Sequence, residues 1–142
     1  MTIHRALALA LAPLVLALGL VGCAHRHRAP PPANSAVELR SFQSRAFDTT
    51  DEAKTLRTII ATLQDLGFIV DDADATLGSV SATKPSRRAL RITVTVRPRG
   101  EKQLVVRANE QSGRNAVTDP GPYQDFFVAL EKAMFLTAQQ VD

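Results

Sequence analysis

The sequence predicts an α+β fold of two layers, in which an antiparallel sheet of about four to five strands is covered on one face by two helices. Residues 90–97 and 103–109 alternate between apolar and polar side chains, as strands covered on one face do. Apolar residues recur at helical spacing over 53–66 and again over 123–134. The expected order is strand, helix, three or four antiparallel strands, and helix.

Residues 1–22 are expected to be a signal peptide. Arg5 makes the start positive, and Ala6 to Leu20 is a run of 15 residues made almost wholly of Ala, Leu and Val. That length suits the apolar region of a secretory signal, which has roughly 7–15 residues. A membrane-spanning helix needs about 20 apolar residues, and this run reaches only 17 when extended to Gly22. An uncleaved single-span membrane protein with the same domain is the alternative.

The apolar run ends in Leu20-Val21-Gly22-Cys23, which holds the only cysteine of the chain. This motif resembles the lipobox of bacterial lipoproteins. The resemblance implies that a signal peptidase recognises Leu20, Val21 and Gly22 and cuts before Cys23, whose thiol carries a diacylglycerol. Two or three acyl chains would then hold the protein at a membrane, whereas one chain binds only marginally. Ala24 follows in place of the aspartate typical of inner-membrane retention, which favours the outer membrane facing the periplasm.

Residues 23–36 are expected to be the lipidated cysteine and a tether. Pro30, Pro31 and Pro32 favour an extended polyproline II conformation, and the segment has no hydrophobic periodicity. The basic stretch over 25–28 allows three interpretations: a metal site through its two histidines, a contact with anionic lipid headgroups, or a solvated tether. Two histidines without a third ligand are a weak metal signal, so no metal site is predicted.

Residues 37–142 are expected to form a single domain, since this length is enough for one core. Removal of residues 1–22 takes away Arg5, so 16 of the 17 basic side chains remain against 14 acidic ones. A net charge so close to zero argues against a nucleic-acid partner.

The first strand is expected within 37–47, where apolar and polar residues alternate twice. The helix after it should begin at Thr49, because Thr49 and Glu52 have the spacing of a capping box. Gly67 should supply the left-handed residue after the helix, with Phe68 closing a Schellman motif. The apolar stripe consists of Ala53, Leu56, Ile59, Ile60, Leu63 and Leu66.

A second strand is expected to start at 68–70 and to lead into Asp71, Asp72 and Asp74. These carboxylates do not follow the ligand spacing of a calcium-binding EF-hand loop, so a solvated strand edge is the preferred interpretation. Leu77 and Gly78 indicate a turn or bulge. Residues 79–83 are either another strand or a continuation of the same one.

The clearest strand covers 90–97, with a turn at 98–101 and a returning strand over 103–109. One face is apolar, consisting of Leu90, Ile92, Val94, Val96, Leu104, Val106 and Ala108. The opposite face is polar and carries Arg91, Thr93, Thr95, Arg97 and Arg107. Asp119 should cap the last helix, with Pro120 at its first position. The apolar stripe of that helix consists of Tyr123, Phe126, Phe127, Leu130 and Met134.

Three sequence segments, over 63–68, 77–84 and 123–136, together resemble segments of small Gram-negative lipoproteins of largely uncharacterised function. The order of helix, Gly-Phe, acidic strand, glycine and strand is also similar to the helix-grip domains of the BamC-type outer-membrane assembly lipoproteins. The resemblance implies a fold of this kind, used as a binding module.

The sequence favours a non-catalytic binding or scaffold module over an enzyme. All three histidines, at positions 4, 25 and 27, lie outside the domain, and no nucleophile stands beside a base. No cofactor is therefore predicted. Arg91, Arg97 and Arg107 form the candidate binding face for an envelope protein partner, lipopolysaccharide phosphates or lipid headgroups, unless this face is simply solvated.

A carrier of a hydrophobic or lipid ligand is a third interpretation. Phe126, Phe127 and Phe135 would line its cavity, although packing in the core is the preferred explanation of these residues.

Overall fold

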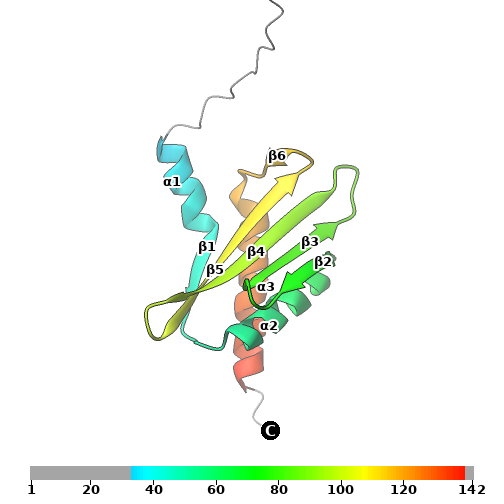
Figure 1. Cartoon of the computed structure of the whole chain (residues 1–142). Coiled ribbons are helices and arrows are strands. Elements are labelled where there is room, and N and C mark those ends of the chain that lie inside the picture. The colour runs from blue at the N-terminus through cyan, green and yellow to red at the C-terminus, as the bar shows by residue number, and fades with distance from the viewer. Residues whose placement is uncertain (1–32, 140–142) are drawn as a thin grey trace, which may run out of the picture. The chain divides into compact units, whose positions relative to one another are not determined.

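The computed structural model describes residues 33–139 of the chain. Within this range six strands make one antiparallel sheet: β1 (Ser44–Phe47), β2 (Ile69–Asp74), β3 (Ser79–Lys84), β4 (Leu90–Arg99), β5 (Gln103–Ser112) and β6 (Asn115–Ala116). The helices are α1 (Ala33–Phe42), α2 (Glu52–Asp65) and α3 (Pro120–Gln139). The order across the sheet is β1-β5-β4-β3-β2, with β6 also beside β5 (Figure 1). The predicted α+β class is confirmed.

The core lies between the sheet and the two long helices, which Figure 1 shows on the same side of the sheet. The inward side chains of the strands are buried, and they are Val80, Ala82, Ile92, Val94, Val96, Leu104, Val106 and Ala108. They form one cluster with the buried apolar side chains of the helices, which are Leu56, Ile59, Leu63, Tyr123, Phe126, Phe127 and Leu130. The strand alternation and the helical stripes predict most of these residues but not Val80 and Ala82, and Ala53 of the predicted stripe is exposed.

The start of the domain differs from the expected strand over 37–42, because residues up to Phe42 belong to α1. Helical spacing places Leu39 and Phe42 on one side, where Phe42 packs against the core while Val37 stays exposed. The alternation over 37–42 therefore does not mark a strand, and α1 also takes in residues 33–36, which were expected to belong to the tether. The first strand, β1, begins only at Ser44.

The ends of α2 are set by local hydrogen bonds. The cap at its start is Asp51 and not Thr49 as expected: the Asp51 side chain accepts the backbone N–H of Lys54 at 2.8 Å. Thr49 instead accepts the N–H of Asp51 at 3.2 Å. The end follows the prediction, because Gly67 has φ +82° and the Phe68 N–H bonds the Leu63 carbonyl at 2.9 Å.

The acidic residues over 71–74 lie in β2, which is an edge strand of the sheet. Its pairing with β3 shifts between Val70 and Asp72, as at a β-bulge, and Asp71 accepts a hydrogen bond from the Thr83 hydroxyl at 2.6 Å. Carboxylates and a bulge on an edge strand both discourage pairing with other sheets. Residues 79–83 belong to a separate strand, β3, so the open alternative is resolved.

The hairpin of β4 and β5 is tighter than expected. Pro98 and Arg99 pair with Leu104 and Gln103, so the turn consists of residues 100–102 rather than 98–101. The start of α3 agrees with the prediction, since Asp119 accepts the Gly121 N–H at 3.0 Å.

The edge of β5 that faces away from β4 is shared by two short segments. Ser44–Phe47 pairs with its first half, and Asn115–Ala116 with its end. One backbone hydrogen bond extends each pairing. The Ala108 N–H donates to the Gln43 carbonyl, and the Val117 N–H donates to the Glu110 carbonyl, each at 2.9 Å. The two segments meet beside Asn109.

Candidate functional site

The predicted binding face is the side of the sheet that points away from α2 and α3, which we call the outer sheet face. Its polar side chains are Arg91, Thr93, Thr95, Arg97, Arg107 and Asn109, which alternate with the buried core residues of β4 and β5. All three predicted arginines are exposed on it.

Only two of these arginines are neighbours. Arg107 is paired with Thr95, and Arg97 with Val105, so Arg97 and Arg107 are diagonal across adjacent strands, about 7–8 Å apart at the backbone. Arg91 is paired with Thr83 and Gln111 near the other end of the same strand. The expected basic strip is therefore a pair and a separate third charge.

Arg97 has a structural role as well. Its Nη1 donates to the carbonyl of Leu77, in the turn between β2 and β3, and to the Val96 carbonyl at 2.8 Å. A guanidinium that holds a turn is directed away from a partner above the sheet. Arg97 is therefore less available to a partner than its exposure suggests.

The inner face of the sheet holds a charged residue that the sequence interpretation missed. Glu110 continues the inward series of β5 after Leu104, Val106 and Ala108, and it is only 2% exposed. Its Oε2 is buried and has no hydrogen-bond partner within the described residues. A buried carboxyl group without a partner is costly, and such groups occur at functional sites more often than elsewhere. The predicted strand ends at Asn109. Extending its alternation of inward and outward side chains by one residue would have placed Glu110 inward.

Glu110 lines a pocket of about 220 Å³, which we call the Glu110 pocket. Its apolar wall consists of Leu66, Phe68, Leu90, Pro122 and Phe126, and its two other charged lining residues are Lys84 and Asp125. Both of these are exposed, so they flank the side of the pocket that opens to solvent. The Lys84 ammonium lies 5.7 Å from the centre of the Phe68 ring. Segments from the end of α2, from β3, β4 and β5, and from the start of α3 thus meet around one carboxyl group.

Burial raises the pKa of Glu110 from its ordinary value of 4.5 to about 7. Desolvation is the largest cause, because it penalises the ionised form. The positive charge of Lys84 lowers this pKa and the negative charge of Asp125 raises it. Glu110 therefore changes its charge near neutral pH.

The backbone beside Glu110 is held by the Tyr123 hydroxyl. This oxygen accepts the Glu110 N–H at 3.1 Å and the Gln43 side-chain amide at 3.3 Å, and it donates to the Val117 carbonyl at 2.9 Å. A buried hydroxyl with three partners is well satisfied. It fixes Glu110 relative to α3 and leaves the carboxyl group to face the pocket.

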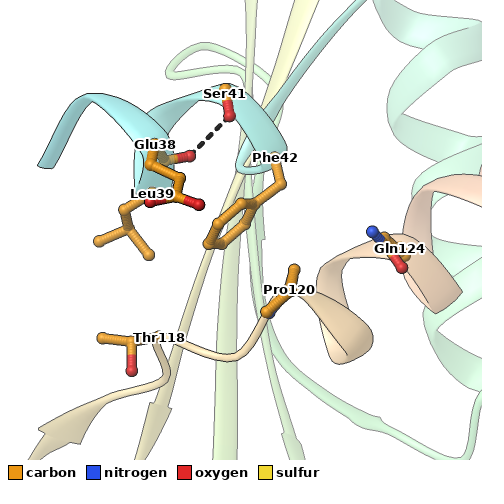
Figure 2. Close-up of a pocket in the computed structure, with 7 residues that line it drawn as sticks. All are labelled: Glu38, Leu39, Ser41, Phe42, Thr118, Pro120 and Gln124. Carbon is orange, nitrogen blue, oxygen red and sulfur yellow. Dashed lines mark hydrogen bonds between the residues drawn. The ribbon is translucent and has the colours of Figure 1, made fainter. Parts of the chain in front are cut away.

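A larger groove of about 510 Å³ lies between α1 and the start of α3 (Figure 2). Glu38, Leu39, Ser41 and Phe42 come from α1, while Thr118, Pro120 and Gln124 come from α3 and the segment before it. The hydrogen bond drawn there is internal to α1, from the Ser41 hydroxyl to the Glu38 carbonyl at 2.6 Å. The groove has no buried charged group, so it is chemically less specific than the Glu110 pocket.

The three aromatic residues considered for a lipid cavity lie in two environments, and only Phe126 and Phe127 are in contact with each other, with ring centres 5.1 Å apart. Phe126 and Phe127 are 1% and 0% exposed and are part of the core, whereas Phe135 is 63% exposed. Phe126 alone lines the Glu110 pocket. Their arrangement agrees with core packing for two of them and surface exposure for the third.

The lipidation motif, Leu20 to Cys23, and the basic stretch of the tether lie outside the described residues. Across residues 33–139, no helix has both the length and the apolar character that crossing a bilayer requires. No protein-family profile matches the chain, and a search of curated proteins returned no match.

Proposed function

We propose that this protein is a lipid-anchored envelope protein that acts as a non-catalytic binding or scaffold module facing the periplasm. Two features support the proposal: the lipobox-like motif ending in Cys23, and the outer sheet face with its exposed arginines. The observation that carries the binding role is the exposure of Arg91 and Arg107 on this face of the sheet. Side chains held on a rigid sheet present fixed charges, which favour recognition of an acidic surface on an envelope protein.

The anchor is tested by replacing the acylated atom. Cys23→Ser should abolish lipid attachment, leave the signal peptide uncleaved by the lipoprotein peptidase, and change the mass of the mature chain. Mass spectrometry of the wild-type N-terminus should give a chain that begins at an acylated Cys23. A wild-type chain that keeps residues 1–22 without lipid would contradict the anchor and support the single-span alternative.

The binding face is tested by charge reversal in the lipidated protein. Arg91→Glu together with Arg107→Glu should remove crosslinks to the envelope partner, because like charges then face each other. Arg57→Glu is the matched control: Arg57 is exposed on α2, on the other side of the sheet. Equal crosslinking by the double variant and the control would contradict a role of the outer sheet face. Loss of vesicle binding without loss of protein crosslinks would reassign this face to lipid headgroups.

A further inference from the structure

We propose that the Glu110 pocket binds a small amphipathic cation, a molecule with an apolar body and an ammonium group that pairs with the Glu110 carboxylate. The site is distinct from the outer sheet face, since Glu110 is on the opposite side of the sheet.

The buried carboxyl group of Glu110 would bind the ammonium group of the ligand. Oε2 of Glu110 is buried and has no donor among the described residues, although the backbone N–H and carbonyl of the same residue are both bonded. An acceptor of this kind lacks a donor, and a charged donor forms a hydrogen bond roughly twice as strong as a neutral one. An ammonium group would provide both the donor and the compensating charge.

The apolar walls of the pocket would hold the apolar body of the ligand. Five of the eight lining residues are apolar, and two of those, Phe68 and Phe126, are aromatic rings that attract cations by their faces. An engineered apolar cavity of about 150 Å³ is large enough for benzene. A pocket of about 220 Å³ therefore has room for one six-membered ring and a short polar head.

The charges around the pocket favour a cation over an anion. When Glu110 is ionised, the lining carries two carboxylates, Glu110 and Asp125, against the single ammonium of Lys84. The other elements that meet here, α2 and β4, contribute the uncharged Leu66 and Leu90, and the Tyr123 phenol is engaged with backbone groups. Lys84 lies over Phe68 and competes with the ligand for the same charges and the same ring.

The test is calorimetric titration of the full chain with cyclohexylamine, with cyclohexanol as the neutral probe of the same shape and cyclohexanecarboxylate as the anionic one. At pH 8 cyclohexylamine should bind and the other two should not. Only ionised Glu110 is competent to pair with the amine, so with a pKa of about 7 the affinity should fall about thirtyfold at pH 5.5. This comparison uses the unaltered protein, so it does not depend on how a variant folds.

Two variants complete the test. Glu110→Gln keeps the shape of the side chain and should weaken cyclohexylamine binding at pH 8 by about tenfold or more. Lys84→Gln, an exposed position, should tighten it, because the competing charge is gone. The proposal is overturned by the absence of cyclohexylamine binding at pH 8, by equal binding of cyclohexanol, or by unchanged affinity in Glu110→Gln. Tighter binding of cyclohexanecarboxylate than of cyclohexylamine at pH 8 would also overturn it, since that result points to an anionic ligand.

Discussion

The Tyr123 hydroxyl lies 3.1 Å from the backbone nitrogen of Glu110 and accepts its hydrogen bond. Through the same oxygen, α3 is joined to Gln43 before β1 and to Val117 after β6. The hydroxyl therefore bonds at the point where the two segments that pair with the same edge of β5 approach each other. One side-chain atom of α3 thus connects β5 to the residues that precede β1 and follow β6.

Tyr123→Phe should lower the free energy of unfolding by about 1–3 kcal/mol, because the buried N–H of Glu110 and carbonyl of Val117 each lose a partner. The measurement is urea denaturation followed by far-UV circular dichroism, since Tyr123 is the only tyrosine and the chain has no tryptophan. Phe135→Leu, at an exposed position on the same helix, serves as the control and should change stability by less than about 0.5 kcal/mol. Equal stability of Tyr123→Phe and wild type would show that these hydrogen bonds contribute nothing net.

The stability of the domain should fall as the pH rises from 4.5 to 7. Below pH 4.5 Glu110 holds its proton in both the folded and the unfolded state. Between these values the unfolded chain releases the proton first, because the folded pKa is raised to about 7. The free energy of unfolding should therefore decrease by at most about 3 kcal/mol and level off above pH 7.

Glu110→Gln isolates this effect, since glutamine resembles the protonated acid and does not titrate. Urea denaturation of both proteins at several pH values gives the difference in unfolding free energy, in which all other titrating groups cancel. The variant should become the more stable protein at pH 8. Two parallel curves from pH 4.5 to 8 would contradict a raised pKa of Glu110.

Gly78→Ala should be much more damaging than Gly100→Ala, although both glycines have positive φ, at +56° and +62°. A Cβ at Gly78 would lie 2.8 Å from the Val96 carbonyl oxygen and would overlap the Glu52 carboxylate. A Cβ at Gly100 would meet nothing within 4 Å. We expect a loss of about 1 kcal/mol at Gly100, from the left-handed backbone alone, and about 3 kcal/mol at Gly78. Thermal unfolding of the two variants checks this order, and similar losses would contradict it.

The ion pair between Arg45 and Glu131 should contribute little despite its length of 2.7 Å. Both side chains are more than a third exposed, so water and salt screen their attraction. Glu131→Gln should cost less than about 1 kcal/mol, whereas Arg45→Ala should cost more because the guanidinium also lies 5.1 Å from the Phe127 ring centre. A double-mutant cycle of Arg45 and Glu131, measured in low and high salt, separates the energy of the ion pair from that of the contact between Arg45 and the Phe127 ring. A coupling that persists in 1 M salt would contradict the screening argument.

Features that depend on neighbours in sequence were predictable. Gly67 and Phe68 end α2 as expected, since a left-handed glycine and a Schellman bond need only the preceding turn. Asp119 and Pro120 start α3 for the same reason. The alternation over 90–97 predicted which side chains of β4 are buried.

Features that depend on distant parts of the chain were not predictable. The stretch over 37–42 fits a short strand or one side of a helix equally, and its helical state depends on the packing of Phe42 beside Tyr123, whose ring centre is 5.4 Å away. Thr49 and Asp51 are both good caps, and the choice between them follows from where the chain leaves β1. Likewise, the pocket around Glu110 exists only because α2, β3, β4 and α3 converge there, and no local pattern contains that information.

The shared edge of β5 has a consequence for the order in which the sheet can form during synthesis of the chain. Among the described strands β1 comes first and pairs with β5 alone, so it has no partner until α2, β2, β3, β4 and β5 have all followed. The closing bonds from Tyr123 come later still. The sheet is thus closed only when the last third of the chain has been made, and a nascent chain holds an unpaired β1 until then.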